Sequence, residues 1–212
     1  MFPMNHHLTD QLLMGYSAGA LPEAFNLVAA THISLCDDCR AQLAEFDTLG
    51  GSLLQASPPA ALADGSLQAT LALIAGARAE PVRSPKGALP APLRDYVGPD
   101  LDQVKWRPVG MGVKQMILPT SKAASARLLH IPPGVAMPGH GHRGIELTLV
   151  LQGAFRDATD RFGPGDIEVA DEAIKHTPVA EPGQPCICLA ATDAPLRFTG
   201  LVPRLVQALF RI

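Results

Sequence analysis

The sequence predicts a protein of two domains, an α-helical N-terminal domain followed by an all-β C-terminal barrel. The chain has 212 residues, which suits two small domains. Residues 79–92 hold four prolines in fourteen positions, as a linker does. Apolar residues recur at helical spacing before this segment and form short runs between Gly and Pro turns after it. We therefore place the helical domain at 1–85, the linker at 86–92 and the barrel at 93–195, and expect 196–212 to be a C-terminal extension packed on the barrel.

Four helices are expected in the first domain, over residues 8–20, 22–34, 37–49 and 64–75. Thr9 can cap the first helix, and Pro22 suits the first turn of the second. Gly50-Gly51 offers a stop for the third helix. Either Asp64 or Ser66 can cap the fourth.

Six short strands are expected after the linker. They are Val113–Leu118, Ala126–Ile131, Leu147–Leu151, Ala154–Arg156, Asp166–Val169 and Ile187–Ala191. Strands of this length in regular succession, without a helical period, are typical of a sandwich or a barrel.

Charge is distributed unevenly along the chain. Residues 1–85 contain three arginines against eight carboxylates, a net charge of −5, whereas residues 86–212 contain fourteen basic against twelve acidic residues, a net charge of +2. An acidic first half disfavours direct nucleic-acid binding and suits a basic protein partner, although it can also serve only as a solubilising surface. The longest apolar run, Leu71–Ala77, is too short to span a bilayer, and residues 1–7 lack the pattern of a signal peptide. We expect a cytoplasmic protein that does not bind membranes.

The first candidate site is His32-x3-Cys36-x2-Cys39. On a helix, positions i, i+4 and i+7 share one face, so the three side chains can converge. Two thiolates and an imidazole are ligands that Zn²⁺ takes in closed, tetrahedral structural sites. A fourth ligand can come from His6 or His7, just before the first helix. The alternative is a CxxC redox pair, or two unliganded cysteines beside a surface histidine.

The second candidate site is Gly134-x5-His140-x-His142-x3-Glu146-x6-Gly153, which matches the first cupin motif. The even spacing places the two imidazoles and the carboxylate on one face of a strand. A fourth ligand is expected from His176, which follows the turn at residues 163–166. The second cupin motif is irregular here, because residues 170–172 replace its usual P-x-G and no Asn follows. Zn, Mn, Fe, Ni and Cu all accept such ligands, and the alternative is a barrel without a metal.

Cys186 and Cys188 form the remaining cysteine pair. At i and i+2 on a strand, both thiols point to one face. They are either small buried hydrophobic residues or a redox-sensitive pair near the barrel metal.

Three segments together resemble the ChrR-type zinc-binding anti-sigma factors: His6–Asp10, Thr31–Arg40 and Glu146–Asp157. The resemblance runs nearly from end to end. It implies that the helical half is a zinc-binding anti-sigma domain and that the β half is a cupin, a jelly-roll or double-stranded β-helix barrel. It also places the fourth zinc ligand on His7 and favours zinc as the barrel metal.

This resemblance implies an anti-sigma factor without enzymatic activity. It would bind an extracytoplasmic-function (ECF, group IV) sigma factor as a 1:1 heterodimer, and the cupin would be needed for release under singlet oxygen or oxidative stress. Candidate partner contacts on the predicted helices are Leu12, Leu13, Tyr16, Phe25, Leu71 and Ile74. The alternative is a metal-dependent, dioxygenase-like cupin oxidoreductase with an accessory helical domain.

Overall fold

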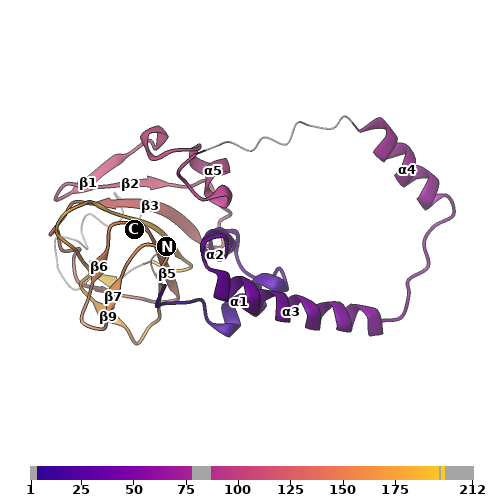
Figure 1. Cartoon of the computed structure of the whole chain (residues 1–212), viewed down its shortest axis with the longest axis horizontal. Helices are drawn as coiled ribbons and strands as arrows, with labels where there is room; N and C mark the ends of the chain where they lie inside the picture. The colour runs from indigo at the N-terminus through magenta and orange to yellow at the C-terminus, as the bar shows by residue number, and fades with distance from the viewer. Residues whose placement is uncertain (1–3, 78–86, 196, 199–212) are drawn as a thin grey trace.

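The computed structural model describes residues 4–77, 87–195 and 197–198 (Figure 1). The helices are α1 (Asp10–Ser17), α2 (Glu23–Leu35), α3 (Asp37–Ala56), α4 (Ser66–Gly76) and α5 (Ala91–Val97), followed by a 3-10 turn at Leu101–Gln103. The strands are β1 (Arg107–Gly110), β2 (Val113–Ile117), β3 (Ser125–Ile131), β4 (His140–Gly141), β5 (Glu146–Gln152), β6 (Phe155–Arg156), β7 (Arg161–Phe162), β8 (Ile167–Ala170), β9 (Lys175–His176), β10 (Val179–Ala180), β11 (Cys186–Thr192) and β12 (Arg197–Phe198). A helical half followed by an antiparallel β half confirms the predicted fold class.

The start of the first helix is as predicted. The Thr9 side chain accepts a hydrogen bond from the Leu12 amide at 3.3 Å, which satisfies one of the free amides of the first turn. Pro22 stands directly before α2 in an extended conformation. The fourth helix differs from prediction, because its N-cap is Gly65 at φ 79° and neither Asp64 nor Ser66 caps it.

The end of the third helix was predicted wrongly. α3 continues through Gly50-Gly51 and ends at Ala56. Neither glycine has a positive φ, so neither forms the left-handed cap that ends many helices. A glycine inside a helix costs only about 1 kcal/mol relative to alanine, and the good helix formers Leu53 and Leu54 follow.

Helix α5 was not predicted. Its first residue, Ala91, lies in the expected linker, and Pro90 precedes it at φ −54°. Proline is well suited to the start of a helix, so the prolines of this segment begin a short helix as well as interrupt the chain.

The β half consists of antiparallel strands in two layers. One layer is a six-stranded sheet in the order β1-β2-β3-β11-β5-β8, and the described strands of the other form two small sheets, β10-β6-β7 and β12-β4-β9. The C-terminal extension was expected to pack on the barrel. Of it, the described part is Arg197–Phe198, which pairs with β4, and the other positions lie outside the described residues.

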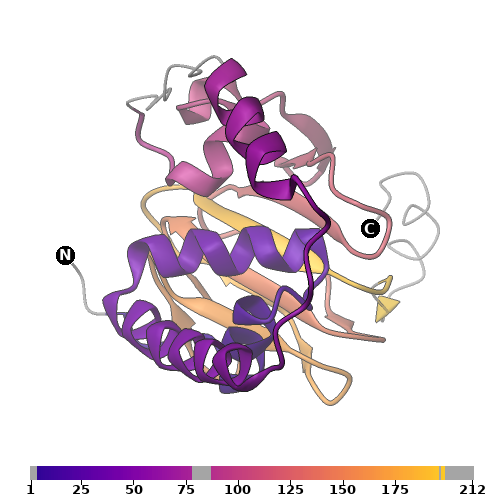
Figure 2. The ribbon, with the colours of Figure 1, turned by 90° about the vertical axis from the view of Figure 1, so that its right-hand side faces the viewer.

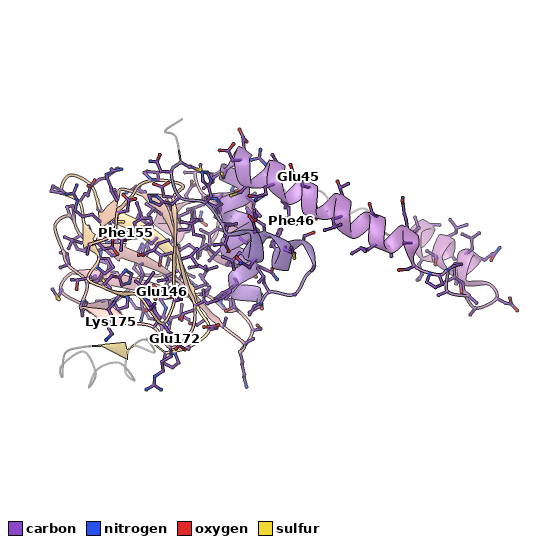
Figure 3. All side chains as sticks on the ribbon, turned by 90° about the horizontal axis from the view of Figure 1, so that it is seen from below. Glu45, Phe46, Glu146, Phe155, Glu172 and Lys175 are labelled. Carbon is purple, nitrogen blue, oxygen red and sulfur yellow. The ribbon has the colours of Figure 1, made fainter. Side chains whose placement is uncertain are left out.

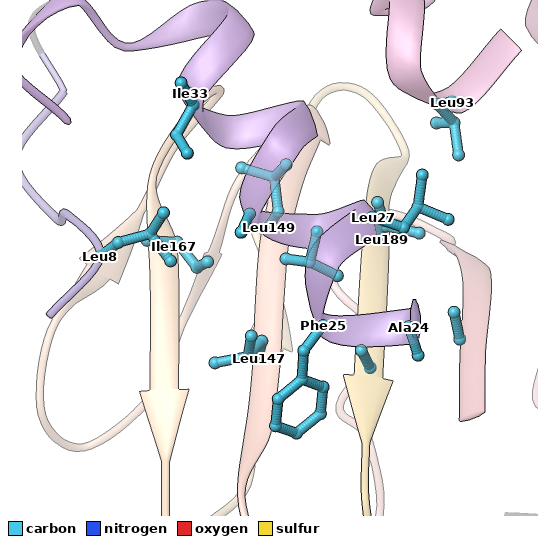
Figure 4. Close-up of a cluster of buried hydrophobic side chains, with 14 of the residues drawn as sticks. Leu8, Ala24, Phe25, Leu27, Ile33, Leu93, Leu147, Leu149, Ile167 and Leu189 are labelled. Carbon is cyan, nitrogen blue, oxygen red and sulfur yellow. The ribbon is translucent and has the colours of Figure 1, made fainter. Parts of the chain in front are cut away.

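Helix α2 covers the outer face of the large sheet, and α1, α3 and α5 pack against α2. Figure 2 shows α2 lying across the strands, and Figure 4 shows Phe25 and Leu27 of this helix above Leu147, Leu149 and Leu189 of β5 and β11. Leu147, Leu149 and Leu189 are fully buried. The two halves of the chain are therefore packed together by one apolar cluster.

The distal half of α3 and all of α4 extend away from this body (Figures 1 and 3). Among the described residues of α4, none is buried. Large apolar side chains are exposed on both helices: Leu49, Leu53, Leu54, Leu67, Leu71, Leu73 and Ile74. No helix in the described part of the chain is long and apolar enough to cross a membrane.

Candidate metal centres

The first cluster forms where α2 meets α3. His7, His32, Cys36 and Cys39 offer ligand atoms that all lie within 4.8 Å of one another. The Nδ1 of His7 is 3.3 Å from the Cys36 sulfur and 3.7 Å from that of Cys39, and His32 Nε2 is 3.3 Å from Cys39 Sγ. The side chains converge although they do not share one continuous helix. His32 lies in the last turn of α2, and Cys36 is the extended residue between α2 and α3.

The electrostatics of this N-terminal site suit a cation. Burial, aided by the nearby His7, lowers the pKa of His32 from 6.5 to about 4, so the ring is neutral and free to ligate. Burial and the neighbouring Cys36 raise the pKa of the Cys39 thiol from 9.0 to about 11. A bound cation reverses this cost, because metal coordination deprotonates thiols. Two thiols and two imidazoles fit a closed tetrahedral zinc site.

His6 lies outside this cluster. Its Nε2 is 3.0 Å from the Asp160 carboxylate, and its ring lies 4.3 Å from that of Phe162. Of the two adjacent histidines, the structure brings His7 to the cysteines.

The second cluster lies inside the barrel. His140, His142 and His176 bring ring nitrogens within 4.8 Å of one another, and the Nε2 atoms of His140 and His176 are 3.1 Å apart. His140 on β4 pairs directly with His176 on β9. Glu146 at the start of β5 lies 3.3 Å from His142 Nδ1, but within the described residues it is not part of the 4.8 Å group.

Several atoms in the barrel cluster are placed as metal ligands would be. In the described part of the chain, both ring nitrogens of His142 and one carboxylate oxygen of Glu146 are buried without a hydrogen bond. His140 Nδ1 donates to the Pro138 carbonyl, and His176 Nδ1 donates to Glu168. When both rings are neutral, their Nε2 atoms therefore face each other as acceptors. Such an arrangement is unfavourable alone and favourable around a shared metal.

Two acidic residues beside His176 were not predicted. Glu168 Oε1 is 2.9 Å and Asp157 Oδ2 is 3.1 Å from His176 Nδ1. Burial disfavours the His176 imidazolium, but these carboxylates outweigh it and raise its pKa. The sequence feature that could have identified Glu168 was its position as a charged residue on the inward-facing side of β8, two residues after Asp166. Asp157, Glu168 and His176 form a third group, whose possible ligand atoms lie within 4.8 Å of one another.

Glu146 is held in its charged form. Burial would raise its pKa, but the contact with His142 and the charges of His140 and His176 together lower it. An ionised carboxylate beside three imidazoles completes a donor set that transition metals accept.

Cys186 and Cys188 are buried on β11, and their sulfur atoms are 3.5 Å apart as free thiols. The contact with Cys186 and burial raise the pKa of Cys188 well above its usual value, and the charges of Glu168 and Glu146 add to the effect. Both cysteines belong to the apolar cluster inside the barrel, together with Val150, Phe155 and Phe162.

The fold and these clusters define a cupin protein that carries an additional helical module with a candidate metal cluster. A family model described as the ChrR cupin-like domain matches residues 95–195. Anti-sigma-E factor ChrR of Cereibacter sphaeroides is 59% identical over 211 residues, which are 99% of each chain. The crystal structure of Rhodobacter sphaeroides SigE in complex with the anti-sigma ChrR matches with a TM-score of 0.81 and 57% identity, over 90% of this chain and 100% of that chain.

The chain belongs to the ChrR family of anti-sigma factors. It is a regulator of transcription rather than an enzyme, so the oxidoreductase alternative is not favoured.

Proposed function

We propose that this chain sequesters an ECF (group IV) sigma factor in a 1:1 complex in the cytoplasm, and that singlet oxygen or another oxidative stress releases it. The observation that carries the proposal is the apolar surface on distal α3 and α4, here called the partner surface. It consists of Leu49, Leu53, Leu54, Leu67, Leu71 and Ile74, each more than half exposed. Large apolar side chains left exposed on helices, one of which has no buried residue in its described part, are typical of a protein–protein interface.

The structure separates the six candidate contacts into two groups. Leu12, Leu13 and Phe25 are buried in the chain's own core, and Tyr16 packs against it. Leu71 and Ile74 are 55% and 65% exposed. This division supports α4 rather than α1 or α2 as the binding element.

The charge of the helical half supports the same kind of partner. The net charge of −5 over residues 1–85 suits a basic, DNA-binding protein, since complementary charge speeds association. Direct binding of nucleic acid by this chain is not part of the proposal.

Both clusters are proposed to hold zinc. At the N-terminal site, His7, His32, Cys36 and Cys39 would tie the N-terminal segment to the α2–α3 junction, which is a structural role. At the barrel site, His140, His142, Glu146 and His176 would hold the second ion. A metal there supplies Lewis acidity and a reactive position inside the barrel, which suits a sensor.

The helical half and the barrel are proposed to divide the work. Residues 1–85 would bind the sigma factor, and residues 86–92 would connect this part to the barrel. Residues 93–195 would sense the oxidative stress, and 196–212 would form an extension of the barrel. Leu43 and Phe46 of proximal α3 pack against the shared core, so it connects the barrel to the helix that leads to the partner surface.

The test is to co-express the full chain with the sigma factor encoded beside it and to measure complex formation and sigma-dependent transcription. We expect a stable 1:1 complex and loss of transcription. Cys39→Ala should abolish inhibition, whereas His140→Ala should retain inhibition and alter the response to singlet oxygen. If no sigma factor binds the chain, the proposed function is wrong. If the two substitutions give the same phenotype, only the division of labour is wrong.

A further inference from the structure

One turn of the barrel contacts the N-terminal metal site directly. This turn, residues 163–166, leads into β8, and its last residue, Asp166, is buried at 3% exposure. The Asp166 carboxylate accepts hydrogen bonds from the Asn5 amide at 2.7 Å and the His6 amide at 3.1 Å. The Ile167 amide donates to the His6 carbonyl at 3.3 Å. The barrel therefore fixes the backbone immediately before His7, a candidate ligand.

The same turn also orients a second ligand of that site. His32 Nδ1 donates to the Gly165 carbonyl at 2.9 Å, while His32 Nε2 points at Cys39 Sγ. A hydrogen bond from the non-ligating nitrogen fixes the tautomer and the ring orientation of a metal-binding histidine. For His32, the acceptor comes from 133 residues away in the other half of the chain.

Three residues further on, the same segment serves the barrel site. Glu168 on β8 accepts a hydrogen bond from His176 Nδ1 at 2.9 Å, and His176 Nε2 faces His140. The arrangement repeats that of His32, with the outer nitrogen bound to an acceptor and the inner nitrogen turned to the site. Residues 165–168 thus supply an outer hydrogen-bond acceptor for one histidine of each cluster. For His176, Asp157 is a second acceptor, at 3.1 Å.

This segment is held firmly by its neighbour in the sheet. The Gly165 amide donates to the Val150 carbonyl at 2.8 Å, and the Val150 amide donates to the Asp166 carbonyl at 3.0 Å. Gly165 has a φ of +91°, and a Cβ there would lie 2.6 Å from the Met4 side chain. A displacement of β8 at Glu168 therefore changes the positions of Gly165 and Asp166 as well.

We propose that residues 165–168 position ligands of both metal sites and so couple metal binding at one site to metal binding at the other. Gly165 and Asp166 are positioning residues for the N-terminal site, and Glu168 is a positioning residue for the barrel site. The coupling is reciprocal, because filling either site stabilises the arrangement of β8 that the other requires. This inference rests on the proposed binding of zinc at both clusters.

The experiment measures zinc affinity in the full chain under reducing conditions, by competition with a chromogenic chelator. The N-terminal site is measured alone in His140→Ala/His142→Ala, and the barrel site alone in Cys36→Ala/Cys39→Ala. Each affinity is compared with that of the same site in the unsubstituted chain. We expect each site to bind zinc about 5- to 150-fold more weakly when the other is disabled, with the same factor in both directions.

Asp166→Ala tests the route. This substitution should weaken the N-terminal site and bring the coupling factor close to one. Glu168→Gln should weaken the barrel site by about 10- to 100-fold, the usual effect of losing an outer-shell partner, and should also reduce the coupling. Asp100→Ala is the matched control, because Asp100 accepts one backbone hydrogen bond from Ala88 and is not a member of any of the candidate metal clusters. If Asp166→Ala does not fold, Asp166→Asn retains one carbonyl oxygen and the shape of the side chain.

Two results overturn the coupling: site affinities that do not depend on the other site, or a coupling factor that survives both Asp166→Ala and Glu168→Gln. One further result would contradict the premise that both clusters bind zinc, rather than the coupling itself. If the unsubstituted chain binds fewer than two zinc ions, the proposed metal function fails and the coupling fails with it.

Discussion

Cys36 has two structural roles. It is the N-cap residue of α3, directly after α2, and its sulfur belongs to the N-terminal cluster. Its extended backbone, at φ −107° and ψ 112°, lets the chain change direction between the helices, and its sulfur accepts a hydrogen bond from the Cys39 amide. A residue at this position must both cap a helix and offer a ligand to the cluster.

Replacing Cys36 by serine separates the capping role from the ligand role. Serine is a good N-cap, but its hydroxyl is a poor substitute for a zinc-binding thiolate. Cys36→Ser should therefore lose N-terminal zinc and lower the melting temperature nearly as much as Cys36→Ala, which loses both functions. Metal analysis and thermal unfolding of the two variants measure this. A Cys36→Ser protein that unfolds like the unsubstituted chain would show that the cap, not the metal, stabilises the junction.

The buried thiols of the barrel give a second prediction at this scale. Since burial and the contact with Cys186 raise the pKa of Cys188, little thiolate is present at neutral pH. Iodoacetamide should label Cys186 and Cys188 slowly in the metal-loaded protein and faster after chelation loosens the barrel. Mass spectrometry after timed quenching provides the rates. Equal and low rates in both states would exclude a redox pair controlled by the metal.

Local spacing made the candidate ligand residues predictable, but the residues that support them could not be predicted. His32, Cys36 and Cys39 are close in sequence, as are His140, His142 and Glu146, so short motifs identify them. Asp157 and Glu168 reach His176 only because β8 pairs with β5, with Glu168 opposite Thr148, and because β6 and β7 meet nearby. Such partners depend on sheet register, which no short motif records.

Among the elements, the ends of the six expected strands were predicted more accurately than helix ends, but six further strands among the described residues were not predicted: β1, β4, β7, β9, β10 and β12. The expected strand Ala126–Ile131 differs from β3 by one residue, since apolar runs bounded by turns mark strands clearly. Gly50-Gly51 did not end α3, because a stop requires a left-handed residue and not merely a glycine. A short helix such as α5 has too few turns for a periodic pattern.

The glycines inside α3 give a prediction about this helix. An alanine Cβ at Gly50 would meet no heavy atom within 4 Å apart from its chain neighbours and the nearby backbone of its own helix. Gly50→Ala should therefore stabilise α3 by about 0.5–1 kcal/mol, because alanine loses less backbone entropy in a helix. Hydrogen exchange of distal α3 amides measures this directly. The control is Gly65→Ala, which should be destabilising since Gly65 holds a φ of +79°. Faster exchange in Gly50→Ala would mean that this part of α3 is not helical in solution.

At the scale of the whole molecule, the contact between the halves was not anticipated. The signal was present, because Leu147–Leu151 is apolar on both faces apart from Thr148, as in strands buried on two sides. This pattern does not show which element covers the outer face of the strand, because that depends on tertiary packing. The structure assigns that role to α2.

The partner surface predicts how binding and stability separate. Leu71→Asp and Ile74→Asp should weaken sigma-factor binding at least tenfold, since charges would be placed in an apolar interface, while leaving the melting temperature almost unchanged. Isothermal titration and thermal unfolding test both parts. Met111→Asp is the matched control, because Met111 is 67% exposed but lies on the turn between β1 and β2. Equal affinities of all three variants for the sigma factor would show that the interface lies elsewhere on the molecule.

The hydrogen bond between Asn5 and Asp166 also sets an order of events during synthesis. The two residues are 161 positions apart, so a ribosome adding about 5–20 residues per second makes the second roughly ten to thirty seconds after the first. During that interval the nascent helices have their cysteines but neither the Asp166 carboxylate nor the Gly165 carbonyl. The N-terminal cluster therefore reaches its final geometry only after Asp166 has left the ribosome.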